Sequence, residues 1–394
     1  MPSTGSPGCG VDVAAGDIDA LREALEDADD TATEAGCTTW EIRVSGTYIV
    51  TPAAGPLVHE EPVALRVVGP AGGTARIEAD GVGTRLIDAL DGGPLTLERI
   101  VLAGGSVEGV VGDDLGGAVL AGVVHLVDSE LIGNTAAGGA AVYADEVHAD
   151  RVSFVQNSTP TGDGARAGGA IAATGAVTLT NVTFVENFAV AGGAVWLGPG
   201  ALLDAKFVTF WDNQADGDEA GADLHVAAVP AGAISLRAVL FGGAASGTSC
   251  GGAGFPDDAD DLDVEGSFAV DSSCTGVTEV SGPLTFTTVP FLAGTTALPV
   301  PDGGPASIGQ VACGAGWPAV DQRGVARPQG DTCDAGAVER EVMVVPPPPP
   351  PPLPPVPEPQ PEPEPEAVVE GPVPTSVPAG DGTCADGCPA FGRR

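Results

Sequence analysis

The 394-residue sequence has few basic residues and few aromatic residues, so it lacks what a nucleic-acid-binding surface or an aromatic-rich core requires. Its composition also disfavours long helices. Lysine and arginine total 15 against 54 aspartates and glutamates, and the net charge of −39 excludes nucleic acid and anionic lipid as partners. Only two tyrosines and 11 phenylalanines are present, whereas glycine occurs 59 times and proline 36 times. This composition favours a body of tight turns and small stacked side chains.

The sequence also lacks an apolar run long enough to span a membrane, and its first 30 residues lack the basic start and apolar core of a signal peptide. Its cysteines nevertheless indicate an oxidising, extracellular or outer-surface location, because they fall into successive close pairs. A misassigned start or an unconventional export route would reconcile the two observations. Zinc is the weaker interpretation of the cysteines, since no nearby histidines complete four ligands. The expected disulfides are Cys9 with Cys37, Cys250 with Cys274, Cys313 with Cys333, and Cys384 with Cys388.

A repeat occupies the middle of the chain. The segments ELIGN, SFVQN, TFVEN and TFWDN end at Asn134, Asn157, Asn187 and Asn213, with spacings of 23, 30 and 26 residues. The positions ten, eight, five and three residues before each Asn are nearly all apolar, and similar copies begin at Leu95 and Ile234. Apolar residues at i and i+2, followed by a three-residue step, predict two short strands around a bend.

Glycine pairs with small or apolar followers, such as GGAI at 168–171, supply a third strand in each copy. Three short strands per copy, stacked in register, predict an all-β fold, a right-handed parallel β-helix over residues 41–340. At the ~4.8 Å strand spacing this body would hold roughly ten turns. The insertions before the glycine pairs are expected to form loops along one edge of the body.

Two ladders are expected inside this solenoid. The repeated Asn side chains either point inward and hydrogen-bond from turn to turn, or favour the left-handed backbone of a turn, and the two interpretations are compatible. Phe154, Phe184 and Phe210 are expected to form one inward column, continued by Leu131 and Phe241. Replacing Phe184 with Ala should then cost about 3–5 kcal/mol, and replacing its outward neighbour Thr183 well under ~1 kcal/mol.

The two ends of the chain differ from the body. Within the first segment, 1–40, residues 17–28 predict a helix with Asp17 as its N-cap, which can cover the open end of the solenoid. The segment 341–380 is rich in Pro and Glu and predicts a disordered polyproline II stalk. A tail containing two cysteines follows at 381–394.

The GGAI and FxxN repeats resemble those of polymorphic outer-membrane proteins, and residues 12–340 resemble choice-of-anchor Q proteins, which have a pectin-lyase-like β-helix. The most specific match is the closing segment at 313–339, where a D-x-R-G-x-x-R-P stretch, at Asp321, Arg323, Gly324, Arg327 and Pro328, precedes a D-x-G-A-x-E stretch ending at Glu339. The resemblance implies a secreted or surface-attached bacterial β-helix followed by an anchor. No sorting signal or membrane helix is recognisable after the stalk.

The sequence shows no convincing catalytic site, although many parallel β-helices cleave acidic polysaccharides. Of the polygalacturonase motifs only GDD is present, at 112–114, and one short acidic match in so acidic a chain is expected by chance. A lyase needs a basic residue beside a carboxylate cluster, and Lys206 is the only lysine. The leading hypothesis is therefore a non-enzymatic secreted or cell-surface scaffold that is adhesive or binds glycans. The alternative is a polysaccharide lyase or glycoside hydrolase acting on acidic polysaccharide.

Calcium is the one metal that the sequence suggests. Asp261, Asp263 and Glu265 begin a calcium-loop pattern, but Ser272 stands where a bidentate Glu is required. An acidic, solvated loop is the favoured interpretation of this stretch. A second and weaker candidate consists of Asn213, Asp216, Asp218 and Glu219.

Overall fold

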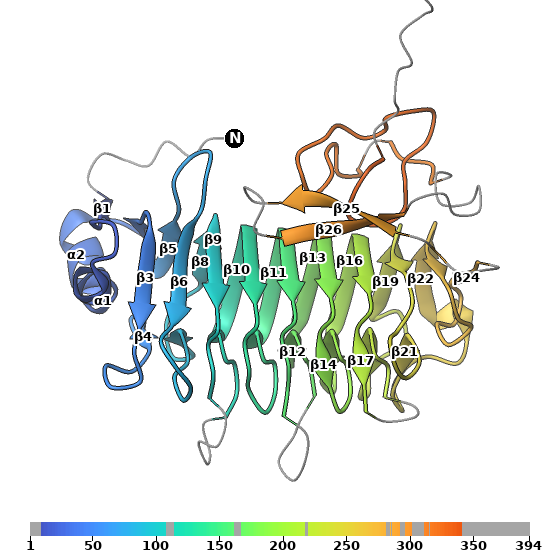
Figure 1. The fold of residues 1–394 in the computed structure, drawn as a ribbon, viewed down its shortest axis with the longest axis horizontal. Helices are drawn as coiled ribbons and strands as arrows, with labels where there is room; N and C mark the ends of the chain where they lie inside the picture. The colour runs from blue at the N-terminus through green and yellow to red at the C-terminus, as the bar shows by residue number, and fades with distance from the viewer. Residues whose placement is uncertain are drawn as a thin grey trace, which may run out of the picture. The chain divides into compact units, whose positions relative to one another are not determined.

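The computed structural model describes residues 9–107, 114–160, 167–216, 220–280, 284, 286–291, 296–301, 311–314 and 316–340. Within these ranges the chain forms a right-handed parallel β-solenoid of about nine turns, which confirms the fold predicted from the repeat (Figure 1). Parallel pairing extends from Gly10 to Glu279, rather than from 41 to 340. The difference arises because a strand before the helix joins the first turn and the described residues after 285 do not stack as further turns.

Each turn contributes a strand to three faces of the solenoid. Face 1 contains β1 (Gly10–Asp12), β2 (Thr39–Arg43), β5 (Ala64–Val68), β8 (Leu95–Glu98), β19 (Ile234–Arg237) and β22 (Leu262–Glu265). Face 2 contains β3 (Thr47–Val50), β6 (Ala75–Ala79), β9 (Ile100–Ala103), β20 (Leu240–Phe241), β23 (Phe268–Ala269) and β24 (Thr278–Glu279). Face 3 contains β4 (Leu57–Val58), β7 (Ile87–Ala89), β12 (Ile171–Ala173), β15 (Val195–Leu197), β18 (Leu224–Val226) and β21 (Cys250–Gly251).

In the middle of the solenoid the strands run around the corners without a break. Faces 3, 1 and 2 are joined in this way by β10 (Val119–Ile132) and β11 (Val142–Val155), and faces 1 and 2 by β13 (Ala176–Val185) and β16 (Leu202–Trp211). A small two-stranded sheet follows the repeated Asn, formed by β14 (Phe188–Ala189) and β17 (Gln214–Ala215).

The corner between faces 1 and 2 explains the three-residue step of the repeat. One residue per turn adopts a left-handed backbone there, with φ of 47–56° at Arg99, Asp128, Arg151, Asn181, Phe207 and Ala238. Such a residue interrupts the strict alternation of a strand, so that the apolar residues on both sides of it point into the same core. The predicted inward positions are accordingly paired turn by turn, as in Val124 with Val147 and Val147 with Val177.

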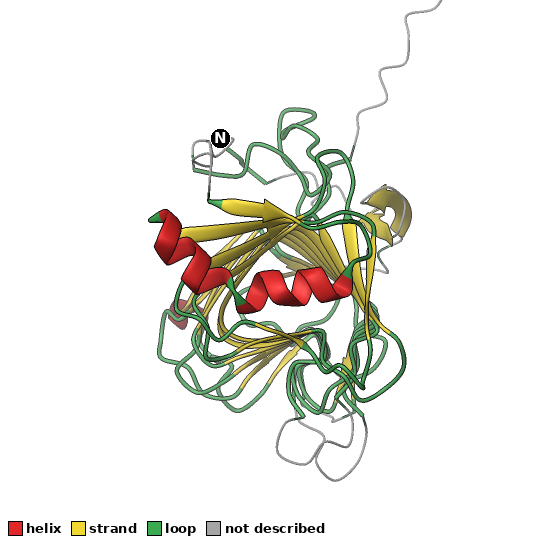
Figure 2. Ribbon diagram, turned by 90° about the vertical axis from the view of Figure 1, so that its left-hand side faces the viewer, coloured by secondary structure: helices red, strands yellow, loops and turns green. Residues whose placement is uncertain are grey.

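Two helices cover the N-terminal end of the solenoid, α1 (Ile18–Glu26) and α2 (Ala28–Ala35) (Figure 2). The first was predicted, and its N-cap Asp17 accepts a hydrogen bond from the Ala20 N–H at 3.0 Å. Leu21 and Leu25 are buried against the first turns and so shield its apolar interior. The second helix was not predicted, because ADDTATEA has no clear apolar face.

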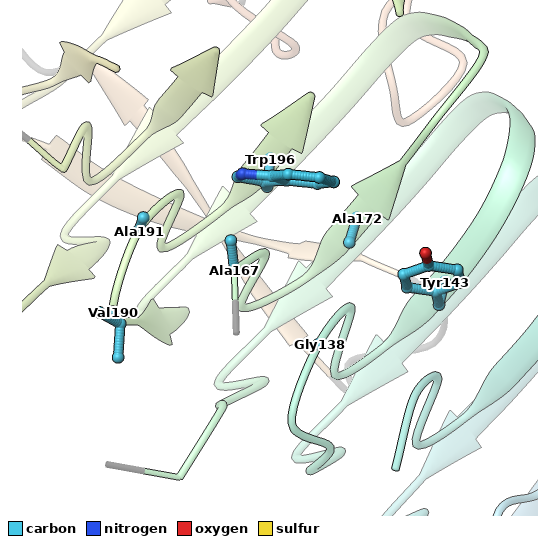
Figure 3. A pocket seen from close by; sticks show the side chains of 7 residues that line it. All are labelled: Gly138, Tyr143, Ala167, Ala172, Val190, Ala191 and Trp196. Carbon is cyan, nitrogen blue, oxygen red and sulfur yellow. The ribbon is translucent and has the colours of Figure 1, made fainter. Parts of the chain in front are cut away.

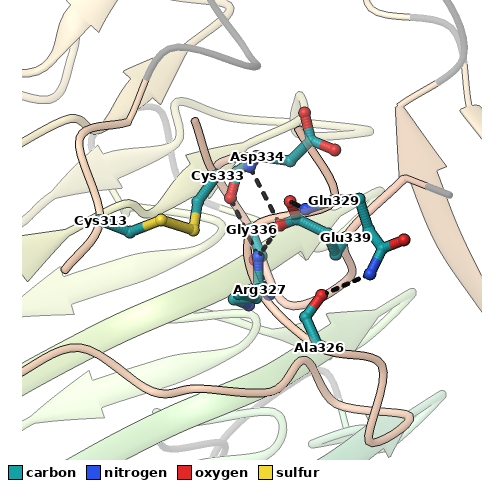
Figure 4. The surroundings of a disulfide bond; sticks show 8 residues. All are labelled: Cys313, Ala326, Arg327, Gln329, Cys333, Asp334, Gly336 and Glu339. Carbon is teal, nitrogen blue, oxygen red and sulfur yellow. Dashed lines mark hydrogen bonds and ion pairs between the residues drawn. A yellow bond between two sulfur atoms is a disulfide. The ribbon is translucent and has the colours of Figure 1, made fainter. Parts of the chain in front are cut away.

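The residues after the last turn fold back along the outside of the solenoid. An antiparallel hairpin, β25 (Phe286–Phe291) and β26 (Thr296–Pro301), precedes the closing segment 311–340 (Figure 1). The closing segment is pinned by a buried ion pair between Arg327 and Glu339 at 2.6 Å and by the disulfide Cys313–Cys333 (Figure 4). Burial raises the pKa of the Glu339 carboxyl.

This closing segment covers the outer side of face 2 and overturns one expectation. Thr183 was expected to face solvent, but it is fully buried and donates a hydrogen bond to Gln322 at 2.5 Å. Gln322 also donates to the Val152 carbonyl at 2.9 Å, and the Ala337 N–H donates to Thr209 at 2.9 Å. Thr183 points out of the core as predicted, but another part of the same chain lies over it.

Three of the four predicted disulfides are present, Cys9–Cys37, Cys250–Cys274 and Cys313–Cys333. The fourth predicted pair, Cys384 with Cys388, lies outside the described residues, as do the predicted stalk at 341–380 and tail at 381–394. By its internal contacts the chain divides into Met1–Met343 and Val344–Arg394, and the second unit belongs wholly to the part that is not described. Among the described helices none is long and apolar enough to cross a membrane.

Candidate functional site

The outer side of face 3 carries the most distinctive surface among the described residues. Neighbouring strands align its outward residues in one row, because side chains on paired parallel strands lie above one another. The row consists of Asp88, Leu120, Tyr143, Ala172, Trp196 and His225. Two of its aromatic side chains, Tyr143 and Trp196, stand two turns apart with the small Ala172 between them.

A pocket of about 370 Å³ lies beside these three residues. Tyr143, Ala172 and Trp196 form one wall, and the turns at Gly138, Ala167, Val190 and Ala191 form the other (Figure 3). Three of these turn residues, Gly138, Ala167 and Ala191, precede their partners on the first wall by five positions. The pocket is thus a groove that repeats over three consecutive turns, and we call these residues the aromatic groove.

The turn residues of the aromatic groove are hydrogen-bonded from one turn of the solenoid to the next. The turn residues stack as a row of their own, in which Gly138, Ala167 and Ala191 each accept one backbone N–H from the preceding turn, at 2.9–3.1 Å. These three oxygens are therefore engaged in the hydrogen bonds between successive turns.

On the turns before and after the pocket, side chains hydrogen-bond to the carbonyl oxygens at the equivalent turn position. Beyond Ala191, the His225 Nδ1 lies 2.9 Å from the Ala220 carbonyl oxygen, and burial lowers the pKa of this imidazole, which favours the neutral ring with its proton on Nδ1. Before Gly138, the Arg85 Nη2 donates to the Leu115 carbonyl at 2.9 Å. The residues that line the pocket lie on the three turns between these two hydrogen bonds.

The predicted Asn ladder lies in the core. Asn134, Asn157, Asn187 and Asn213 are all fully buried, and each of the first three donates its Nδ2 to the Oδ1 of the next at 2.8–3.0 Å. The ladder ends at Asp223, which accepts from Asn213 at 2.9 Å. Burial raises the pKa of the Asp223 carboxyl to about 7. The alternative interpretation, that these Asn adopt the left-handed backbone of a turn, is wrong, because the left-handed residue is in each case the one before the Asn. A catalytic role does not describe the Asn either, since their amide groups are consumed by the ladder.

The predicted aromatic column is also present in the core. The rings of Phe154, Phe184, Phe210 and Phe241 are stacked at centroid separations of 4.9–5.0 Å. Their interplanar angles are 4–8°, and their side chains are at most 1 % exposed. The column therefore contributes to stability and presents nothing to a ligand.

The residues suggested for calcium are not gathered into a site. Asp261 ends a short 3-10 helix, whereas Asp263 and Glu265 lie on the outer side of β22. Asp263 pairs with Arg237 and accepts from Ser235, and the hydrogen bond from Arg237 lowers its pKa. In the weaker candidate, Asn213 belongs to the buried ladder, and Asp218 and Glu219 lie outside the described residues. No group of three or more potential metal ligands occurs in the described residues.

The residues considered for catalysis are likewise scattered, and so are two histidines on the solenoid surface. Asp113 of the GDD motif lies outside the described ranges. Lys206 pairs with Asp204 of its own strand at 2.5 Å. His125 and His148 stack on the outside of face 1 at 4.6 Å, and burial together with the neighbouring His148 lowers the pKa of His125. Among the described residues these groups do not assemble a nucleophile, an acid and a base.

Sequence reasoning missed the aromatic groove. Tyr143 and Trp196 occupy the middle position of the third strand, and the signal that could have revealed them is their shared offset of five from the preceding turn residue.

Comparisons of the chain with protein-family models, with curated proteins and with solved structures each find no match. What can be stated is the fold: the chain is a parallel β-solenoid.

Proposed function

We propose that this protein is a non-enzymatic scaffold, exported or displayed on the cell surface, that binds glycans through the aromatic groove. The observation that carries the proposal is the position of two partly exposed aromatic side chains, Tyr143 and Trp196, beside one pocket whose lining residues are uncharged. Sugar rings present C–H groups to aromatic faces, so such a pocket suits a saccharide.

The location of the groove supports the same proposal. It runs along the edge where insertions vary the loop lengths, and binding residues of repeat proteins tend to lie on such loop-bearing edges. Three disulfides stabilise the body, as expected for a protein that works in an oxidising environment. The polymorphic outer-membrane and choice-of-anchor Q resemblances remain part of this proposal and would place the protein at the bacterial surface.

A glycan array followed by titration of the full chain tests the proposal. Trp196→Ala and Tyr143→Ala should each weaken glycan binding at least tenfold. His148→Ala is the matched control, because it removes an outward ring from the same turn as Tyr143 but on face 1. Equal loss in all three variants, or no glycan binding by the parent protein, would contradict the proposal.

The enzymatic alternative is tested on the same ligands. A scaffold should release neither reducing ends nor unsaturated products from any glycan that it binds, over hours at micromolar protein. Turnover that disappears on changing Asp113 or Asp114 would instead establish the protein as a carbohydrate-active enzyme.

A further inference from the structure

A second pocket lies at the N-terminal end of the solenoid, which the two helices cover (Figure 2). Its volume is about 450 Å³, and residues of β1, β2, α1 and α2 line it, so we call it the N-terminal pocket. We infer that the N-terminal pocket binds an extended, basic peptide that adds as a strand to the free edge of β1. The inference is independent of glycan binding, because the two pockets share no residue.

One edge of β1 has no partner among the described strands. β1 pairs in parallel with β2, and no other described strand pairs with it. The Val13 N–H donates to the Arg43 carbonyl at 2.9 Å, so the backbone groups of Val11, two residues earlier, point to the same side. The N–H and C=O groups of Asp12 therefore point to the opposite, unpaired edge. Such an edge is a template for a further strand.

The N-terminal pocket runs along this free edge. Four consecutive residues, 11–14, line it. Successive side chains of an extended chain point to opposite faces, so a pocket that touches four in a row lies along the edge of the chain rather than over one face. Val11 and Trp40 supply apolar surface to the pocket, and Trp40 is 5 % exposed. An added strand would find both backbone partners and an apolar contact there.

The opposite wall of the N-terminal pocket is one face of α1. Ala20, Glu23, Ala24 and Asp27 stand three or four residues apart along the helix and all line the pocket. The two alanines are small, so they leave space for a peptide backbone between the helix and β1. The two carboxylates flank this space. The wall thus combines room for a backbone with negative charge beside it.

The charged groups of the pocket select a basic ligand. Three of its ten lining residues are acidic, and none is basic. Asp12 already pairs with Arg43 at 2.6 Å, whereas Glu23 and Asp27 are exposed on the helix. The net charge of −39 also attracts cations from a distance at low salt. A small cation would meet the carboxylates but leave the edge of β1 unpaired, and an extended basic peptide satisfies both.

The first test titrates the full chain with a capped six-residue peptide of alternating lysine and valine. Calorimetry at moderate salt should show binding at least tenfold tighter than for the same peptide with glutamate in place of lysine. Spermine, a polycation without a peptide backbone, should also bind at least tenfold more weakly than the lysine peptide. No binding of the lysine peptide, or equal binding of spermine, overturns the inference.

Backbone methylation of the peptide tests strand addition itself. Methyl groups on alternate amides block one hydrogen-bonding edge of an extended peptide and leave the other edge intact. Two peptides are compared, one methylated on its odd-numbered amides and the other on its even-numbered amides. One of them should lose at least tenfold in affinity and the other less than threefold. Equal affinities of the two methylated peptides would contradict pairing with β1.

Paired substitutions localise the binding. Glu23→Gln combined with Asp27→Asn removes two charges from the N-terminal pocket and should weaken binding of the lysine peptide at least tenfold. Glu26→Gln combined with Glu34→Gln is the matched control, because it removes two exposed charges from the same helices outside the pocket, and it should change the affinity less than threefold. The bound peptide should also slow hydrogen exchange at residues 10–14. Equal losses in the two double variants would mean attraction by net charge alone and would overturn the inference.

Discussion

Replacing Phe184 with Ala tests the register of the solenoid most directly. Phe184 is fully buried between Phe154 at 4.9 Å and Phe210 at 5.0 Å, with both pairs of rings nearly parallel. Truncating a buried Phe costs about 3–5 kcal/mol, and an aromatic pair adds roughly 0.5–1.5 kcal/mol beyond burial. Two pairs are lost, and the strands on both sides are fixed by neighbouring turns, so we expect the upper half of that range, about 4–5 kcal/mol.

Two threonine variants calibrate this value. Thr178→Ala removes an outward, partly exposed side chain on face 1 and should cost less than ~0.5 kcal/mol. Thr183→Ala leaves the buried Gln322 Oε1 without its donor and should cost about 1–3 kcal/mol. The structure thus predicts the order Phe184, Thr183, Thr178.

The readout must allow for local unfolding. A solenoid can loosen the turns adjoining a cavity without unfolding as a whole, so hydrogen exchange at residues 150–215 is the primary measurement and urea denaturation the second. Equal effects of Phe184→Ala and Thr178→Ala on both measurements would refute the register, and with it the assignment of inner and outer positions.

Two further predictions concern the buried polar ladder. Asn187→Ala removes the acceptor of the Asn157 amide and the donor to the Phe154 carbonyl, both at 3.0 Å, and should destabilise the protein by more than ~2 kcal/mol in urea denaturation. Asp223 has a folded-state pKa of about 7, above its ordinary value of 3.8, so the folded state holds the proton more tightly and the free energy of unfolding falls as the pH rises from about 4 to 7. Asp223→Asn should therefore be more stable than the parent above pH 7 by a few kcal/mol, with the difference shrinking toward pH 4, and a constant difference across this range would contradict the assignment.

The turns of the solenoid were predictable from the sequence because one requirement recurs in each of them. Every turn must bury the same four positions against its neighbours, so Val124, Val147 and Val177 reappear at a fixed distance from the repeated Asn. The helix at 17–28 was predictable for another reason, namely that its cap and apolar face are local signals. Such features depend on a few neighbouring residues or on a strict period.

The closing segment was not predictable by the same means. Its position depends on contacts between residues far apart in sequence, such as Gln322 with Thr183 and Trp317 with Phe207. A period in the sequence reveals which residues are equivalent, but it does not reveal which outer face another segment covers. The expectation for Thr183 was therefore wrong about its exposure, although the direction of its side chain was right.

The same reasoning explains why the aromatic groove escaped sequence analysis. Repeat positions are recognised by what stays constant, and on the outer side of face 3 the residue changes from turn to turn: Leu120, Tyr143, Ala172, Trp196, His225. Core positions cannot vary in this way, since each must match its neighbours in volume. Outward positions can, and the departure of a few turns from the repeat is what creates a local site on a periodic scaffold. For this protein, the variation within an aligned outer row is therefore more informative about ligand binding than the conserved spacing that defines the fold.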